Sequence, residues 1–570
     1  MDKIKIKKIS FLVICSISFF LMILSTSLHH LKFNRIESKG QKIVFTDDFG
    51  NQIFNQYYEG TNGKGVMIFH GYGEDQNSMR GYTIEFNRRG YHVFTTDFFG
   101  HGRSSGAFIS NESTDDILAN QVLLAKNEFK KNTGFNDSEI YMVGHSYGAR
   151  AILRASLIDT NTVGGLFLIG PAIHLLSKDF FENNWTQSLS SLNPNTNITI
   201  ISGKLDDICP PEETRALFQK LSNETVFGDR YVFELPNGNQ RGILIIDGLS
   251  HTYEVNAPYA IKDCVTQIMY LQGGFYPLEL PQEILYMQRL RHITWICLPF
   301  FMLLTCVFGF LFLENMKTQN QQDNNNKEII TLEIESSLKI TNLKRFFVFK
   351  TLFAFLSLIV GFLPILLMLI IPINVPLFSL IYPIAIGGYG IIMMILLRYN
   401  KMPGIKGNLQ FDAINIKKFA VKDIAIVAIV SIIFTTIATY FFNSEWYHIF
   451  PGNIRLLWLF ALTIFSSVGF YINRTESEII RQTYPGKLGM QIANYCLFLV
   501  PLIIGTISIA ASGILFIFFE ILHGFLLLLL VQIVGAIINK ICKNKTITAL
   551  LLAFILMFLI IPKGPLVTIF

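Results

Sequence analysis

The pattern of apolar and polar positions divides the chain into parts with different periods. Up to about residue 275, short β-rich runs alternate with helix-length amphipathic segments. From residue 293 onward, apolar runs reach about 17–25 residues, the length at which a helix crosses a bilayer. A separate apolar run, 11–28, lies near the N-terminus. The pattern predicts an N-terminal membrane helix (1–28), an α/β domain (29–290) and an all-α polytopic membrane domain (291–570).

The α/β part is expected to form a mostly parallel sheet covered by helices, because strands and helices alternate along it. The predicted strands are 42–47, 52–58, 66–70, 92–96, 139–144, 165–169, 198–202 and 242–246. The predicted helices are 76–89, 114–131, 147–158, 211–222 and 253–272. Ligand sites in such sheets lie at the carboxyl ends of the strands, so functional residues are expected there.

Eight long apolar runs predict transmembrane helices in the C-terminal half. They lie near 293–313, 351–371, 376–397, 424–442, 456–472, 492–510, 514–538 and 547–562. The turn residues 511–513 divide the stretch 492–538, which is too long for one span. With the N-terminal segment, the sequence predicts nine spans.

Basic residues alternate between the loops as the positive-inside bias requires. The short outer loops carry only Arg455 and Lys563. The cytoplasmic segments carry 22 Lys and Arg, and they are 1–10, 314–350, 398–423, 473–491 and 539–546. This distribution predicts a cytoplasmic N-terminus, an α/β domain on the other side of the membrane and a C-terminus outside. The polar stretch 314–330 is expected to be a disordered linker on the cytoplasmic side.

The N-terminal segment is either a signal anchor or a cleaved secretory signal, since lysines precede its apolar run. The run is long for a cleaved signal, and no convincing small-x-small site follows it, so the sequence favours an anchor. In both cases the lysines stay in the cytoplasm and the chain from residue 29 onward is translocated.

Composition narrows the class of protein further. With 51% hydrophobic, 13% aromatic and 15% charged residues, the chain is neither an ordinary soluble protein nor intrinsically disordered. The net charge of +6 indicates no nucleic-acid partner. It is unevenly distributed, with −6 over 29–292, +9 over 293–570 and the remainder in the N-terminal segment. The seven cysteines have no CxxC spacing, so we expect no metal site. A disulfide between Cys209 and Cys264 is an open alternative to two free thiols.

The pentapeptide Gly144-His145-Ser146-Tyr147-Gly148 follows an apolar strand and precedes a helix-forming run. In this context G-x-S-x-G predicts a sharp strand-to-helix turn that exposes a nucleophilic serine, because the small end residues let the turn close. The alternative is a tight turn with an inert serine.

A serine nucleophile needs a histidine base, which a carboxylate orients, and on such a scaffold the acid and then the histidine follow the serine in the chain. Asp206 comes just after the strand 198–202, where the acid is expected. Asp207 is the second candidate. His251 follows the strand 242–246 and is the candidate base, whereas His174 comes too early in the chain.

Acyl transfer also requires fixed N–H donors for the oxyanion. The segment His70-Gly71-Tyr72-Gly73 directly follows the strand 66–70, where this scaffold supplies one donor. We assign the backbone N–H groups of Tyr72 and Tyr147 to this role. The alternative for the first segment is a simple strand-ending turn.

Together with the serine turn, three further segments, 70–74, 89–93 and 97–104, resemble the α/β-hydrolase superfamily. The resemblance is to its monoacylglycerol lipase and serine aminopeptidase-like branch, over roughly residues 42–275. It implies a Ser–Asp–His hydrolase that acts on esters, thioesters or amides without a cofactor.

This chain departs from that branch in two ways. Only residues 174–197 are available for the cap, which predicts a minimal cap and an open site, and the eight C-terminal spans are not part of the family pattern. Asp97 and His101 match the motif and are expected to shape a loop beside the site.

Two ionisable residues in a predicted span, Glu520 and His523, share a helix face and suggest either a proton-coupled pair or a structural hydrogen bond.

The sequence as a whole predicts a membrane-bound serine hydrolase that cleaves an ester, with the bilayer and a small-molecule or lipid ester as partners. The alternatives are a peptidase or amidase, and a transporter or sensor with a non-catalytic hydrolase-like domain.

Overall fold

A computed structural model describes most of the chain. Its described ranges are 3–34, 39–108, 114–159, 161–176, 184–226, 228–275, 277–323, 338–368, 380–409, 453–484 and 545–561. It also describes the isolated positions 376, 490, 493, 494, 528, 531, 532, 535 and 566. The predicted spans 424–442, 492–510 and 514–538, with Glu520 and His523, lie wholly or almost wholly outside the described residues.

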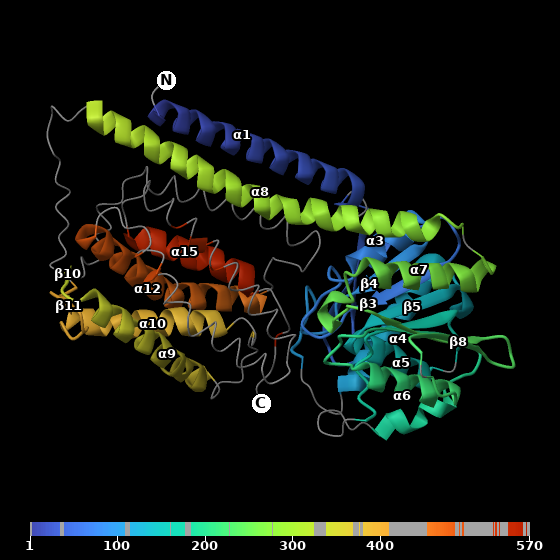
Figure 1. Ribbon diagram of the computed structural model, residues 1–570. Coiled ribbons are helices and arrows are strands. Elements are labelled where there is room, and N and C mark those ends of the chain that lie inside the picture. The colour runs from blue at the N-terminus through green and yellow to red at the C-terminus, as the bar shows by residue number, and fades with distance from the viewer. Residues whose placement is uncertain are drawn as a thin grey trace.

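A nine-stranded sheet forms the centre of the α/β part, in the order β1-β2-β4-β3-β5-β6-β7-β9-β8 (Figure 1). The six central strands from β4 to β9 run parallel, and β1, β2 and β8 are antiparallel to their neighbours. The strands are β1 Gln41–Thr46, β2 Gln52–Tyr58, β3 Gly65–Phe69, β4 His92–Thr96, β5 Ile140–His145, β6 Gly165–Ile169, β7 Asn197–Gly203, β8 Arg230–Glu234 and β9 Gln240–Ile246.

All eight predicted strands are present, with ends within about two residues of the prediction. The prediction missed β8, which pairs with β9 as the outer strand of a hairpin. Most of its side chains are exposed, so it lacks the apolar run by which the central strands were recognised.

Helices cover both faces of the sheet, and each face has its own hydrophobic core. Helices α4 (Thr114–Thr133), α5 (Tyr147–Ile158) and α6 (Pro211–Ser222) pack on one face. Helices α3 (Arg80–Arg88) and α7 (Pro258–Gly273) pack on the other, together with the start of α8 (Leu280–Asp323). The parallel strands are buried on both faces, which explains their continuous apolar runs.

The prediction placed the start of α7 at residue 253, and the observed start is at Pro258. A short 3₁₀ turn, His251–Tyr253, precedes it. Proline favours the first turn of a helix, since it has no N–H to leave unsatisfied there. This turn allows His251 to leave the strand end and face the site.

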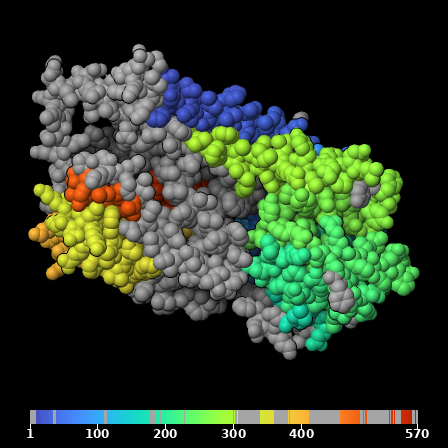
Figure 2. All heavy atoms as spheres, in the orientation of Figure 1, coloured from blue at the N-terminus to red at the C-terminus, as the bar shows by residue number. Residues whose placement is uncertain are grey.

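The long helix α8 connects the α/β part to the C-terminal half, and α1 (Lys3–His29) lies along it in the opposite direction (Figure 1). Hydrogen bonds join the two helices, between His29 Nδ1 and Thr294 Oγ1 at 2.9 Å and from Cys15 Sγ to the Thr305 carbonyl oxygen at 3.5 Å. Their ribbons and surfaces run side by side towards the α/β part (Figure 2).

Helix α8 corrects one feature of the sequence analysis. It continues to Asp323, so the first ten residues of the predicted disordered linker 314–330 are helical. Residues 324–337 lie outside the described part of the chain. The predicted border at 290/291 falls inside this helix, because its first turns pack on the α/β core.

Four further helices, α9 (Leu343–Met368), α10 (Ile381–Arg398), α12 (Asn453–Thr483) and α15 (Lys545–Ile560), pack together in the C-terminal half. Each overlaps a predicted span, although α12 continues beyond 456–472 into the predicted cytoplasmic segment 473–491. By length and composition, two helical segments among the described residues are able to cross a membrane, Ile9–Phe33 and Arg455–Thr483. The multi-pass membrane domain therefore stays a prediction.

A buried polar cluster joins three of these helices, and the sequence analysis did not find it. Lys350 on α9 forms an ion pair with Glu476 on α12 and donates to Asn494 Oδ1 at 2.9 Å. Tyr389 on α10 donates to the same Glu476. Because its neighbours in the sequence are polar, Glu476 is predicted to lie in the cytoplasmic segment 473–491. In the structure it lies in α12 and is buried.

Candidate active site

Ser146 occupies the sharp turn between β5 and α5, with a positive φ of 52°. Such a backbone is strained for a residue with a side chain, and it is the geometry by which a nucleophilic serine projects from the sheet. A Cβ on Gly144 would lie 2.5 Å from the Gly148 carbonyl carbon, and one on Gly148 would meet the carbonyl oxygen of Phe69. Both glycines are therefore required for the turn to close.

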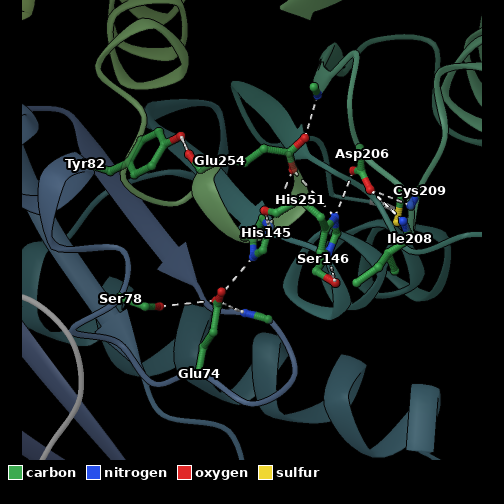
Figure 3. Close-up of polar contacts among 12 residues, drawn as sticks. Glu74, Ser78, Tyr82, His145, Ser146, Asp206, Ile208, Cys209, His251 and Glu254 are labelled. Carbon is green, nitrogen blue, oxygen red and sulfur yellow. Dashed lines mark hydrogen bonds and ion pairs between the residues drawn. The ribbon is translucent and has the colours of Figure 1, made fainter. Parts of the chain in front are cut away.

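Ser146 and His251 are 105 residues apart in the sequence, and Asp206 and His251 are 45 residues apart. The structure brings the three side chains together (Figure 3). Ser146 Oγ lies 3.0 Å from His251 Nε2, and His251 Nδ1 lies 2.8 Å from Asp206 Oδ2. All three residues are buried. With the proton on Nδ1, the imidazole donates to Asp206 and its Nε2 is able to accept the serine proton.

Of the two candidate acids, Asp206 makes the contact with His251. Its other carboxylate oxygen accepts backbone N–H bonds from Ile208 at 2.9 Å and Cys209 at 2.7 Å. These bonds fix the carboxylate in the loop after β7. Asp207 is half-buried in the same loop.

The two proposed oxyanion donors lie on neighbouring segments beside Ser146. Tyr147 is the first residue of α5, and Tyr72 follows the end of β3. Their rings are 5.8 Å apart between centroids. A Cβ on Gly71 would lie 3.0 Å from Ser146 Cβ, so the backbone before Tyr72 closely approaches the serine.

A network of ionisable side chains lies next to His251 and consists of His145, Glu74 and Glu254 (Figure 3). His145 Nδ1 is 3.2 Å from Glu74 Oε2, and its Nε2 is 3.5 Å from Glu254 Oε2. Burial alone would lower the pKa of His145, but the two carboxylates outweigh it and raise that pKa to about 10. His145 is therefore a cation held between two acids.

Glu254 lies close to His251, with its Oε2 3.8 Å from His251 Nδ1. Its other oxygen accepts the Gly203 N–H at 2.6 Å. Burial, followed by the nearby charge of Asp206, raises the pKa of Glu254 to about 7, despite the hydrogen bond from His145. Glu254 is not among the residues predicted from the sequence, although its position three residues after His251 could have indicated a place near the site.

Asp97 shapes the loop after β4, as the sequence analysis expected. Its two carboxylate oxygens accept the backbone N–H groups of Gln76 at 2.9 Å and Arg103 at 3.0 Å. His70 ties this loop to the end of β3, since its Nε2 accepts the Phe98 N–H at 3.0 Å. Burial lowers the pKa of His70, which keeps Nε2 free of a proton and able to accept.

The disulfide alternative is wrong, because Cys209 and Cys264 are both free and buried. Among the described residues, two groups have ligand atoms close enough to hold a metal ion, namely His145 with His251 and Glu254, and Asp206 with Cys209 and His251. Both need a ring nitrogen of His251 that already bonds Ser146 or Asp206. A metal there would therefore compete with the hydrogen bonds that join His251 to Ser146 and Asp206.

In the segment before β7, where a minimal cap is expected, the structure describes a 3₁₀ helix, Asn184–Ser191. Its Trp185 Nε1 donates to Oδ2 of Asp115, a residue of α4, at 2.7 Å. Residues 177–183 lie outside the described part of the chain.

The sequence profile of the family described as "Serine aminopeptidase, S33" matches residues 61–199. This segment contains the Ser146 turn and ends before Asp206 and His251. No functionally characterised protein sequence matches the chain significantly.

The solved structures to which this chain is similar include an esterase from Pyrococcus furiosus, with 18% identity over 40% of this chain and 91% of that one and a TM-score of 0.32. A serine hydrolase homologue from Coxiella burnetii has 14% identity over 41% and 97%, with a TM-score of 0.30. A thioesterase domain of the curacin biosynthetic pathway has 15% identity over 40% and 99%, with a TM-score of 0.30.

The sheet order, the serine turn and the profile match together support an α/β-hydrolase fold for the α/β part. Over residues 61–199 it is similar to the serine aminopeptidase S33 family, and this supports a hydrolase.

Proposed function

We propose that the protein is a membrane-bound serine hydrolase that cleaves an ester by way of an acyl-enzyme. The observation that carries this proposal is the pair of hydrogen bonds from His251, to Ser146 at 3.0 Å and to Asp206 at 2.8 Å. These distances already suit proton transfer without rearrangement. No cofactor is required for this chemistry.

In the proposed reaction, Ser146 Oγ attacks the ester carbonyl while His251 Nε2 takes the hydroxyl proton. The N–H groups of Tyr72 and Tyr147 bind the oxyanion, and the proton then passes to the departing alcohol. Water next attacks the acyl-enzyme with His251 as base, and the carboxylic acid and free serine are released. Asp206 holds the imidazole and stabilises its charge throughout.

The proposal of a membrane location is supported by the surface of α1. Exposed large apolar side chains lie along almost its whole length, and they include Leu12, Ile17, Phe20 and Ile23. A continuous apolar surface of this kind is favourable in lipid and costly in water. A substrate with an acyl chain, a lipid or lipid-linked ester, fits an enzyme held at a bilayer.

The decisive test is labelling of Ser146 by a fluorophosphonate probe in membranes that contain the full chain. Wild type should be labelled and Ser146→Ala should not. If both are labelled alike, or neither is, the domain is a binding module of a transporter or sensor rather than this enzyme.

A peptidase or amidase is the second candidate, because the matching family is described as serine aminopeptidase. The same Ser–His–Asp chemistry serves esters and amides. Comparison of p-nitrophenyl esters with aminoacyl-anilides separates the two. Faster turnover of the anilides, expressed as kcat/KM, would contradict an esterase.

We further propose that the hydrolase domain faces away from the cytoplasm. The basic linker 314–350 would then lie inside, as the positive-inside bias requires. Protease added to intact cells should cut between residues 39 and 275 and spare 338–350. The opposite cleavage pattern would reverse the orientation without affecting the proposed chemistry.

A further inference from the structure

The C-terminal half contacts the hydrolase domain at a loop beside the candidate active site. The carbonyl oxygen of Gly100 accepts the N–H of Leu566 at 2.9 Å, and the N–H of Phe108 donates to the Leu566 carbonyl at 2.7 Å. Leu566 is buried. The chain near its end therefore pairs with both ends of the segment 100–108.

Arg455 adds a side-chain bond to the same position. It stands at the start of α12 and is buried, with its Nη2 3.1 Å from the Gly100 carbonyl oxygen. Its Nη1 donates to the Ile561 carbonyl oxygen, just after α15, at 3.1 Å. One rigid guanidinium with several donors thus connects α12, the end of α15 and the hydrolase loop.

Aromatic ring contacts connect this loop to the two segments beside Ser146. The Phe108 ring lies 5.2 Å from the Tyr72 ring and 5.6 Å from the Tyr147 ring, between centroids. Gly100 has φ +71°, and a Cβ there would lie 2.6 Å from the Phe108 nitrogen, so the two ends of the loop are tightly apposed. The position of Gly100 therefore determines where Phe108 lies.

The rings beside the serine form an apolar wall. Phe108 is buried, and Tyr72 and Tyr147 are half-buried. His101 packs 5.2 Å from the Phe108 ring, and burial, with the charges of His70 and Arg455 adding to it, holds the pKa of His101 well below its usual value. Since His101 is neutral at physiological pH, the wall suits a hydrocarbon chain better than a charged group.

We propose that Arg455 and Leu566 of the C-terminal half are specificity-determining elements of the active site: they fix the loop 100–108 and its aromatic wall to receive the apolar acyl chain of a membrane ester. This inference rests on the proposed hydrolase function. It assigns the C-terminal half a part in substrate selection, in addition to anchoring the enzyme.

The test measures chain-length preference in membranes with the full chain, as the ratio of kcat/KM for p-nitrophenyl dodecanoate to that for the acetate. Arg455→Met keeps the side-chain length but loses the donors, and the ratio should fall about tenfold, since small misplacements near a site have effects of this order or larger. Arg455→Lys should restore part of it. The matched control is Arg481→Met, an exposed position at the other end of α12, which should leave the ratio unchanged.

A second variant ends at Ile561 and removes Leu566. It should lower the same ratio, and it tests the inference if Arg455→Met does not fold. An unchanged ratio in whichever of these variants folds would overturn the inference while leaving the hydrolase intact. If Ser146→Ala retains the wild-type turnover of both esters, the hydrolase proposal itself fails, and the two failures are thereby distinguished.

Discussion

The contact between His251 and Asp206 distinguishes between two adjacent carboxylates that the sequence left as alternatives. Asp206→Asn should lower kcat by about 10⁴-fold, because an amide stabilises the wrong imidazole tautomer. Asp207→Asn is the matched control and should change kcat by less than about tenfold, since the neighbouring Asp206 is the carboxylate that bonds the imidazole. Steady-state hydrolysis of a p-nitrophenyl ester measures both. Comparable losses in the two variants would contradict the assignment.

The ion pair between His145 and Glu74 predicts how stability depends on pH. The pKa of His145 is raised to about 10, so its contribution is complete below about pH 6.5 and is lost as pH rises through 10. Burial alone would raise the pKa of Glu74, but His145 lowers it to about 2, so the contribution is also lost as pH falls from about 4.5 through 2. The plateau should lie between about pH 4.5 and 6.5.

Glu74→Gln should therefore destabilise the hydrolase domain by about 1–3 kcal/mol on this plateau, because the buried His145 loses one of its two carboxylate partners while Glu74 itself is partly exposed. It should also flatten the decline towards pH 10. Thermal unfolding midpoints between pH 5 and 10 measure this effect. The control is Asp116→Asn, which removes the mostly exposed partner of Arg154 and should cost about 0–1 kcal/mol. A wild-type-like decline in Glu74→Gln would show that other groups determine it.

At the scale of elements, the approach of α5 to the end of β3 makes the serine turn sensitive to one methyl group. A Cβ on Gly148 would lie 2.7 Å from the His70 carbonyl oxygen and would also meet that of Phe69. Gly148→Ala should destabilise the domain by about 3 kcal/mol or more, because backbone on both sides has to move. Gly273→Ala at the end of α7, with nothing within 4 Å of the added Cβ, should be neutral or slightly stabilising. Urea unfolding of both variants measures the difference.

The sequence predicted the central strands and the serine turn because their signals are local. Each buried strand is a continuous apolar run, and G-x-S-x-G directly joins a strand to a helix. The order of acid and histidine along the chain then limited the candidates to Asp206, Asp207 and His251. Only the three-dimensional structure shows the loop bonds to Asp206, since local sequence does not determine which of two adjacent side chains turns inward.

Features that join distant segments were not predictable. Glu254 and Glu74 come together only because His145 stands between them, and the local sequence around each does not show this contact. Arg455 was noted as an outer-loop cation, yet its contact with Gly100 spans 355 residues. Hydrophobic periodicity describes which face of an element is buried, and it does not specify which element covers that face.

At the scale of the whole molecule, the first turns of α8 belong to the hydrolase core. Leu280 and Ile284 are buried in the same cluster as Tyr82, and Gln288 Nε2 donates to Glu85 Oε1 at 2.5 Å. A fragment of residues 39–279 should be less stable than one of residues 39–292 by about 3–6 kcal/mol, at about 1.5–3 kcal/mol for each lost aliphatic side chain. Chemical unfolding of the two purified fragments measures this, and equal midpoints would show that α8 merely adjoins the core.

Helix α8 also has a mechanical consequence. Its 44 residues extend about 66 Å, whereas the hydrocarbon core of a bilayer is about 30 Å thick. Within its described residues the helix continues from the hydrolase core without a break. It therefore acts as a rigid connection rather than as a flexible tether. For the membrane-bound enzyme proposed above, such a helix would hold the active site at a fixed height above its own leaflet, and molecules on a facing membrane or free in the medium would have to diffuse to it.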